Sequence, residues 1–403
     1  MTDIAIYTLT SELHDEKSVE ASTHEFLSGL DVNYVLRGNN YEDYGSHTLN
    51  LIYVRTGGTE GLFLRLFRKG CFAIHTQEGR QRPFYLLTSG KSNSLAASME
   101  ILSWLRQQGF AGEIIHGSSE YIHKRILILH QAAEAVRTLH GSRLAVIGQP
   151  SDWLISSNAD REKLRQILGI ELVDIPMETL LSTIAGTAVD NSSDTTGLDE
   201  HIRQSMPVAI QIYNALQTIV RRQQLQGFTL RCFDLLSAVH NTGCLALARL
   251  NAEGIIAGCE GDVPAMVSMA ISHALTGISG FQANPAVIDS EHGLVTFAHC
   301  TIPLNMVEHY EFDTHFESGI GIGIRGFMKE GPVTIFKVSG DLSRHFIAEG
   351  ELVANEAKPD LCRTQQVIRL ADADQVRYFL TNPIGNHHII LPGHHKLALE
   401  EFV

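Results

Sequence analysis

Long apolar runs and an excess of basic residues are both absent from this sequence. No stretch approaches the ~18 consecutive apolar residues of a membrane-spanning helix, so we expect no membrane partner. The formal net charge is −14 at pH 7, which argues against nucleic acid and anionic membranes as partners. The first residues, MTDIAIYTL, have no basic segment and are typical of an opening β-strand rather than a signal peptide.

Cysteine pairs at metal-binding or redox spacing are also lacking. The six cysteines are scattered without a CxxC motif, and most lie in apolar segments. Thiols placed in this way are typical of reduced side chains, so we expect a cytoplasmic protein. At 403 residues the chain is long enough for two or three domains, each with its own core.

The N-terminal half alternates strand patterns with helix patterns. The strand patterns include IAIYTL, LNLIYV, FAIHT and FYLLTSG, and residues 92–109 are the clearest helix. Such alternation predicts parallel sheets covered by helices. A second unit of the same kind begins at RLAVIG, residues 143–148. We therefore expect two Rossmann-like α/β domains, over residues 1–141 and 142–282.

Beyond residue 282 short strands replace the helices. Strand patterns separated by turn residues predict a C-terminal all-β, barrel-like domain over residues 283–403. Within it Gly321, Gly323 and Gly326 satisfy GxGxxG, but a turn and a strand follow instead of the helix that a dinucleotide site requires. The alternation of Gly and Ile instead predicts a strand with one bare face, which another backbone or a ligand can approach.

The stretch GCEGDVPAMVSMAISHALTG joins a strand to a helix in the middle of the chain. An apolar strand ends at the turn Glu260-Gly261-Asp262, and a helical pattern follows from Val263. Asp262 is predicted to be the N-cap residue, with Pro264 near the first helical position. Most Glu-Gly-Asp turns are solvated loops, so the importance of this one depends on the later part of the chain.

Four ionisable residues end or interrupt apolar strands in the last third of the chain, namely Asp289, His299, His387 and His388. Burying such groups is costly unless they are paired or bind a metal. With Glu260 they form an oxygen and nitrogen set that suits Mn²⁺, Mg²⁺ or Fe²⁺. The spacing forms no metal motif, and each histidine taken alone is more often a hydrogen-bonded residue.

Several segments resemble the L-fucose isomerase and L-arabinose isomerase family of metal-dependent aldose–ketose isomerases. They are ALARLNAEGIIAGCEGDVPAMVSMAISHALTG, ANPAVID, FAHCTIP, HFESGIGIGIRG, GPVTIFKVSG and GNHHIILPG. The resemblance runs from about Leu230 to the end and is looser upstream. It implies that Glu260 and Asp289 are the catalytic carboxylates and bind the metal together with His299 and His387.

The resemblance also implies Mn²⁺ or another divalent cation, a monosaccharide substrate beside His315 and His388, and a homotrimer or homohexamer. Metal and carboxylates would then support isomerisation through an enediol(ate). The chain is shorter than these enzymes, in the half that helps close their site. The Gly-rich turns at residues 56–60 and 88–90 could bind a phosphate, so a phosphorylated sugar is also a candidate substrate. The alternatives are a metal-dependent sugar epimerase or lyase, or a non-catalytic sugar-binding relative.

Overall fold

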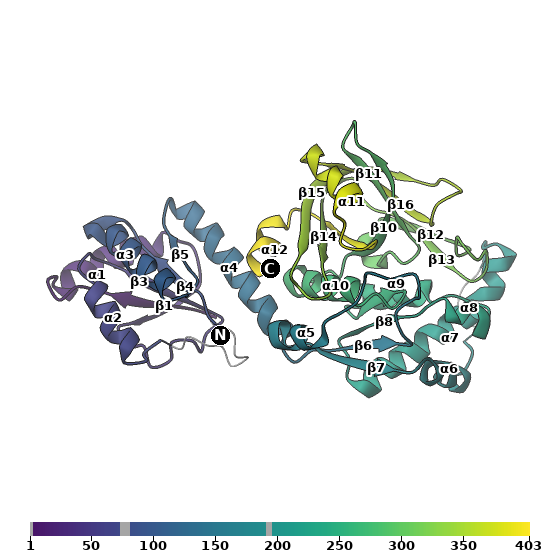
Figure 1. Cartoon of the computed structure of the whole chain (residues 1–403), viewed down its shortest axis with the longest axis horizontal. Coiled ribbons are helices and arrows are strands. Elements are labelled where there is room, and N and C mark those ends of the chain that lie inside the picture. The colour runs from purple at the N-terminus through teal and green to yellow at the C-terminus, as the bar shows by residue number, and fades with distance from the viewer. Residues whose placement is uncertain (1–2, 73–80, 191–195) are drawn as a thin grey trace. The chain divides into compact units, whose positions relative to one another are not determined.

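The computed structural model describes residues 3–72, 81–190 and 196–403. It divides into two compact units, Met1–Arg137 and Thr138–Val403 (Figure 1). The predicted strand FAIHT lies almost entirely outside the described residues. Within the described part of the chain, no helix is both long and apolar enough to cross a membrane. The three-domain division stays a prediction.

The first unit is a parallel sheet with helices on both faces. Its elements are β1 (Ile4–Leu9), α1 (Glu16–Ser28), β2 (Val35–Gly38), β3 (Leu49–Val54), α2 (Glu60–Arg68), β4 (Phe84–Leu87), α3 (Ser94–Gln107), β5 (Gly112–Ile115) and α4 (Ser119–Leu139). The strand order is β2-β1-β3-β4-β5, with every pair parallel. Apolar residues of α2 and α3 pack on one face, and those of α1 and α4 on the other. The predicted Rossmann-like α/β arrangement is confirmed.

The second unit begins with another parallel sheet. Its elements are β6 (Arg143–Ile147), α5 (Arg161–Leu168), β7 (Glu171–Ile175), α6 (Met177–Gly186), α7 (Glu200–Gln223), β8 (Gly227–Leu230), α8 (Asp234–Val239), α9 (Cys244–Ala252), β9 (Ile256–Cys259) and α10 (Val263–Thr276). The strand order is β7-β6-β8-β9, again all parallel. The ends of β6, β8 and β9 point in one direction, so the loops that follow these strands meet at one edge of the sheet.

A closed antiparallel barrel forms the rest of the second unit. The elements are β10 (Phe281–Asp289), β11 (Leu294–His299), β12 (His309–Asp313), β13 (Gly323–Phe327), β14 (Gly331–Val338), β15 (His345–Glu356), β16 (Thr364–Leu370), α11 (Val376–Thr381), β17 (His388–Pro392) and α12 (Lys396–Phe402). The barrel order is β10-β11-β16-β15-β14-β17, while β12 and β13 pair separately. Buried aromatic and branched side chains such as Phe297 and Ile335 fill its core. The predicted barrel is confirmed.

Helix α10 joins the parallel sheet to the barrel. It contacts β8 and β9 of the sheet and β14 and β17 of the barrel. Figure 1 shows α10 between the sheet strands β6 and β8 and the barrel strand β14. Every side chain from Val263 to Ser272 is buried, as expected for a helix that is apolar all round. The predicted N-cap is confirmed, because Asp262 Oδ1 accepts the backbone N–H of Ala265 at 2.8 Å. The N-terminus of α10 is therefore fixed between two layers.

The Gly-Ile alternation forms a strand only from Gly323, because residues 319–322 are an irregular segment before β13. The predicted bare face does not form, since Arg325 and Phe327 share the face of Gly323. A Cβ at Gly321 would lie 2.8 Å from the backbone nitrogen of Thr242, and one at Gly326 would lie 2.6 Å from Ile302. These glycines therefore allow β13 and the segment before it to pack closely against neighbouring segments. They have no dinucleotide-binding context.

A glycine-to-alanine exchange tests the contact between the barrel and the loop after β6. A Cβ at Gly340 would overlap the carbonyl oxygen of Asn158, and Gly340 O accepts the N–H of Asp160 at 2.9 Å. We expect Gly340→Ala to lower the free energy of unfolding by about 2 kcal/mol or more, measured by urea denaturation. Gly186→Ala is the control, since no atom lies within 4 Å there. Equal stabilities of the two variants would contradict the contact.

Candidate metal centre

Glu260 occupies a backbone conformation that is unusual for its residue type. Glu260 and Gly261 both have positive φ, 63° and 71°. A non-glycine residue in this region costs free energy and is held only where its surroundings enforce it, often at functional sites. Here Ser151 N–H donates to Glu260 O at 2.9 Å, and Gly261 N–H donates to Leu230 O at 3.0 Å. A Cβ at Gly261 would lie 2.5 Å from Gln149 O, so the turn is packed between the loops that follow β6 and β8.

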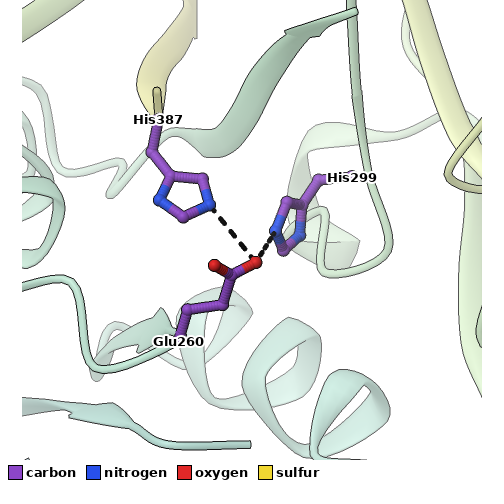
Figure 2. Close-up of side chains that lie close together, drawn as sticks. All are labelled: Glu260, His299 and His387. Carbon is purple, nitrogen blue, oxygen red and sulfur yellow. Dashed lines mark ion pairs between the residues drawn. The ribbon is translucent and has the colours of Figure 1, made fainter. Parts of the chain in front are cut away.

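The structure brings together three of the predicted ligands, Glu260, His299 and His387, from three separate elements (Figure 2). Glu260 Oε1 lies 3.5 Å from His387 Nε2 and 3.7 Å from His299 Nε2. One ligand atom from each residue lies within 4.8 Å of the others. All three residues are buried, and His387 is fully so. Glu260 follows β9, His299 ends β11 and His387 immediately precedes β17.

Each imidazole of the group is oriented by a contact on its other nitrogen. His387 Nδ1 lies 2.8 Å from Asp262 Oδ2, and His299 Nδ1 lies 3.0 Å from Thr301 Oγ1. Both Nε2 atoms therefore face Glu260. Metal-binding histidines in proteins are typically held by such outer contacts.

Asp262 in turn interacts with a buried lysine. Lys337 Nζ lies 3.7 Å from Asp262 Oδ1, and the two side chains are 1% and 0% exposed. Burial opposes the charge of Asp262, but Lys337 and then His387 hold its pKa below its usual value. The carboxylate is therefore ionised, although it is completely buried.

The charges of the group depend on one another. Burial opposes the carboxylate of Glu260, but His387 and His299 hold its pKa well below the usual range. Burial likewise opposes the imidazolium of His387, but Glu260 and Asp262 raise its pKa to about 9. The group thus stabilises charge where burial alone would remove it.

The group fits a divalent cation. His387 Nε2 is buried and has no hydrogen-bond partner among the described residues, although it faces the carboxylate. Such an orphaned nitrogen is explained if it is a ligand, and a bound cation would then displace the proton that Glu260 and Asp262 otherwise hold on His387. One carboxylate oxygen and two imidazole nitrogens suit Mn²⁺, Fe²⁺ or Zn²⁺, and three protein ligands leave positions open for a substrate.

Trp153 is a site residue that the sequence analysis missed. Its indole Nε1 donates to Glu260 Oε2 at 2.6 Å, while half of its surface is exposed. Its ring lies edge-on to Phe233, with centroids 4.8 Å apart, and Phe233 contacts His315 at 5.5 Å. No sequence signal pointed to this contact, because Trp153 and Glu260 are 107 positions apart.

Asp289 does not join the group. It ends β10 opposite Leu294, where its carboxylate accepts the N–H groups of Glu291 and His292 in an exposed turn. Leu294 and His299 are the two ends of β11, a separation of about 16 Å at the usual rise per residue. The role of Asp289 as a second metal carboxylate therefore finds no support in this geometry.

His388 and His315 have different surroundings. Adjacent residues of a strand point to opposite faces, so His388 points into the barrel core, where its Nε2 lies 2.9 Å from the hydroxyl of Tyr378. His315 is half-buried, with Nδ1 3.0 Å from Ser318 Oγ. Burial and then His299 lower its pKa to about 4, so it is a neutral imidazole near neutral pH. Of the two predicted substrate-binding histidines, His315 has the better position.

A second group of potential ligands lies in the first unit. Asp3, His130 and Glu134 have ligand atoms within 4.8 Å of one another. Arg137, however, pairs with Asp3 and with Glu134, each at 3.3 Å. A cation already neutralises these carboxylates, so we assign no metal to them.

A buried carboxylate with two imidazoles, at the junction of a parallel sheet and a β-barrel, defines the class of this site as a candidate mononuclear metal centre. Several similar curated proteins are sulfoquinovose isomerases. That of Clostridium sp. (strain MSTE9) is 24% identical over 257 residues, covering 60% of this chain and 56% of that protein. That of Priestia megaterium (strain ATCC 12872 / QMB1551) is 22% identical over 263 residues, covering 61% and 59%. That of Alkalicoccus urumqiensis is 20% identical over 266 residues, with the same coverage.

The match spans somewhat more than half the length of each of these relatives. No family model matches the chain. Distant homologues are thus sugar isomerases by name, which agrees with the coarser part of the resemblance. A specific relation to the fucose and arabinose enzymes stays a prediction.

Ligand substitutions test the composition of the centre. We expect Glu260→Gln and His387→Asn each to weaken Mn²⁺ binding by more than the ~10–100-fold that loss of an outer contact costs. Asp289→Asn should leave the affinity unchanged, because its carboxylate lies in an exposed turn. Calorimetric titration of chelator-treated protein measures all three. Equal loss in Asp289→Asn would contradict the grouping.

The pair Asp262 and Lys337 calls for a double-variant test. Asp262→Asn should destabilise the fold by about 3 kcal/mol, because it leaves a buried charge on Lys337 without its partner. Adding Lys337→Met should restore most of this stability. Mn²⁺ affinity should stay ~10–100-fold lower in both variants, since His387 has lost its carboxylate. Full recovery of Mn²⁺ affinity in the double variant would refute the orienting role of Asp262.

Proposed function

We propose that this protein is a metal-dependent aldose–ketose isomerase that acts on a monosaccharide through an enediol(ate) intermediate. The observation that carries the proposal is the convergence of Glu260, His299 and His387. The names of the distant homologues support the same reaction. Sulfoquinovose, the sugar in those names, is the first substrate to test, beside neutral aldoses. A cytoplasmic homotrimer or homohexamer remains our expectation.

Different residues would bind the metal and orient its ligands in such a reaction. Glu260 Oε1 and the two Nε2 atoms of His299 and His387 would hold Mn²⁺ or another divalent cation. The chemistry that a bound cation supplies is polarisation of the carbonyl and hydroxyl oxygens at C1 and C2 of the open-chain sugar. Trp153 keeps Glu260 Oε2 occupied, so that the other oxygen faces the imidazoles. Asp262 occupies Nδ1 of His387, so that Nε2 of this histidine faces Glu260.

Proton transfer between C2 and C1 needs a base beside the sugar. We assign this role to His315, since Ser318 occupies its Nδ1 and leaves Nε2 for the substrate. A neutral imidazole can take the proton from C2 and return it to C1, while O2 loses its hydroxyl proton and O1 gains one, so that the carbonyl moves from C1 to C2. Asp289, expected to be one of the catalytic pair, is left out because its exposed turn places it away from the group. Glu260 remains the essential carboxylate.

Three other functions remain as candidates for the same site. An epimerase or a lyase could use the same enediol(ate), and a sugar-binding relative could keep the fold without catalysis. The retained ligand group argues against the non-catalytic alternative. Product analysis separates the other two.

Deuterium incorporation provides the test. Protein loaded with Mn²⁺ is incubated in deuterated water with sulfoquinovose and a panel of neutral aldoses, the reaction is quenched with chelator, and the sugars are examined by proton NMR. We expect a ketose carrying deuterium at C1. Glu260→Gln and His315→Gln should each lower the rate at least ~100-fold, whereas Asp289→Asn should not. Deuterium at C2 without a ketose would identify an epimerase, and no exchange with any sugar would sink the isomerase.

A further inference from the structure

We infer that Trp153 is a carbohydrate-stacking platform, on which the C–H face of the sugar lies while its oxygens face the metal centre. The inference deepens the proposed function and rests on it for the identity of the ligand as a sugar. It starts from a conflict in the surroundings of one side chain. The indole N–H is bound to a buried carboxylate, yet half of the side chain is exposed to solvent.

An exposed indole beside a buried charged group calls for an explanation. Tryptophan buries most of its surface on average in folded proteins, and aromatic side chains are frequent in the lining of ligand sites, so a half-exposed indole bound to a buried carboxylate is a candidate contact surface. Only Trp104 and Trp153 are tryptophans in this chain, and Trp104 is partly buried and packs against the core of the first unit, at Phe63 and Phe67. Trp153 has an equally well-defined position without that burial.

Contacts of the ring and of the loop that carries it hold Trp153 in place. Phe233 supports it edge-on at 4.8 Å, with an interplanar angle of 79°. The preceding residue, Asp152, accepts two hydrogen bonds from Arg231, at 3.2 and 3.0 Å. Arg231 also donates to Pro150 O at 2.7 Å, which ties down the loop that carries the tryptophan. The ring is thus preorganised, so that binding would cost little side-chain entropy.

The chemistry of this surface matches a sugar. Aromatic ring faces carry partial negative charge and attract the polarised C–H groups of an apolar ligand face. The indole N–H reaches Glu260 Oε2, so a ligand on the exposed surface of the ring lies next to the predicted metal ligand. Phe233 contacts both Trp153 and His315, so the three rings form one aromatic surface beside Glu260. An alditol or an open-chain sugar has C–H groups that this surface would bind and oxygens that the metal centre would bind.

The competing explanation is that Trp153 serves only to orient Glu260. Two substitutions separate the roles. Trp153→Phe keeps an aromatic face and loses the N–H donor, whereas Trp153→Gln keeps an N–H donor and loses the ring. Stacking predicts that the glutamine variant loses sugar affinity, while a purely orienting role predicts that the phenylalanine variant does. Ile155→Ala, an exposed position on the same loop, is the control for loop disturbance.

Fluorescence of the full chain reports on the platform directly. In a Trp104→Phe background Trp153 is the single indole, and a panel of hexitols is titrated into protein loaded with Mn²⁺, with calorimetry in parallel. We expect a saturable change in Trp153 emission for at least one hexitol. Its dissociation constant should rise about tenfold in Trp153→Gln, by less than about threefold in Trp153→Phe, and not at all in Ile155→Ala.

Three outcomes would overturn the inference. They are hexitol binding by calorimetry with unchanged Trp153 emission, equal affinities in the glutamine variant and its parent, and no binding of any hexitol. The test does not depend on turnover. A hexitol that binds Trp153 in a protein without isomerase activity would support the platform and refute the proposed function. An active isomerase with the first or second outcome would do the reverse.

Discussion

The buried carboxylate of Asp262 is the group on which the rest of the site depends. It accepts the N–H of Ala265 at the start of α10, orients His387 and neutralises Lys337, all without exposure to solvent. These contacts join the helix that contacts the parallel sheet to two strands of the barrel. A buried charge with fewer partners would be strongly unfavourable. The same carboxylate therefore links the sheet, the helix and the barrel and orients a predicted metal ligand.

The strained turn beside this carboxylate has a matching explanation. Glu260 keeps a positive φ because the loop after β6 and the end of β8 hold its backbone and that of Gly261 from both sides. The same loop carries Trp153, whose indole fixes the second carboxylate oxygen. The backbone strain and the side-chain orientation are thus maintained by the same neighbours, and the proposed ligand-binding surface is built from the loop that creates the strain.

Much of the fold and part of the site could be predicted from the sequence. The alternation of strand and helix patterns predicted the two parallel sheets, and the short strand patterns predicted the barrel, since hydrophobic periodicity follows from local geometry. Glu260, His299 and His387 were predicted as ligands and are brought together. Asp289 was predicted with them but lies at the turn between β10 and β11. This turn is at the opposite end of β11 from His299. Distances along a hairpin are not visible in a motif. Trp153 was missed because it lies 107 positions before Glu260 and no sequence motif links the two residues.

The sequence by itself determined the elements, the apolar faces and the N-cap at Asp262, because each depends on residues close together in the chain. Only the tertiary structure decided which polar groups meet. Lys337 and Asp262 attract each other because packing places both in one dry space, where neither charge can remain alone. His387 and His388 are neighbours in sequence, yet one faces the candidate metal centre and the other the barrel core. That choice follows from strand pleating and register, which exist only after the barrel has closed.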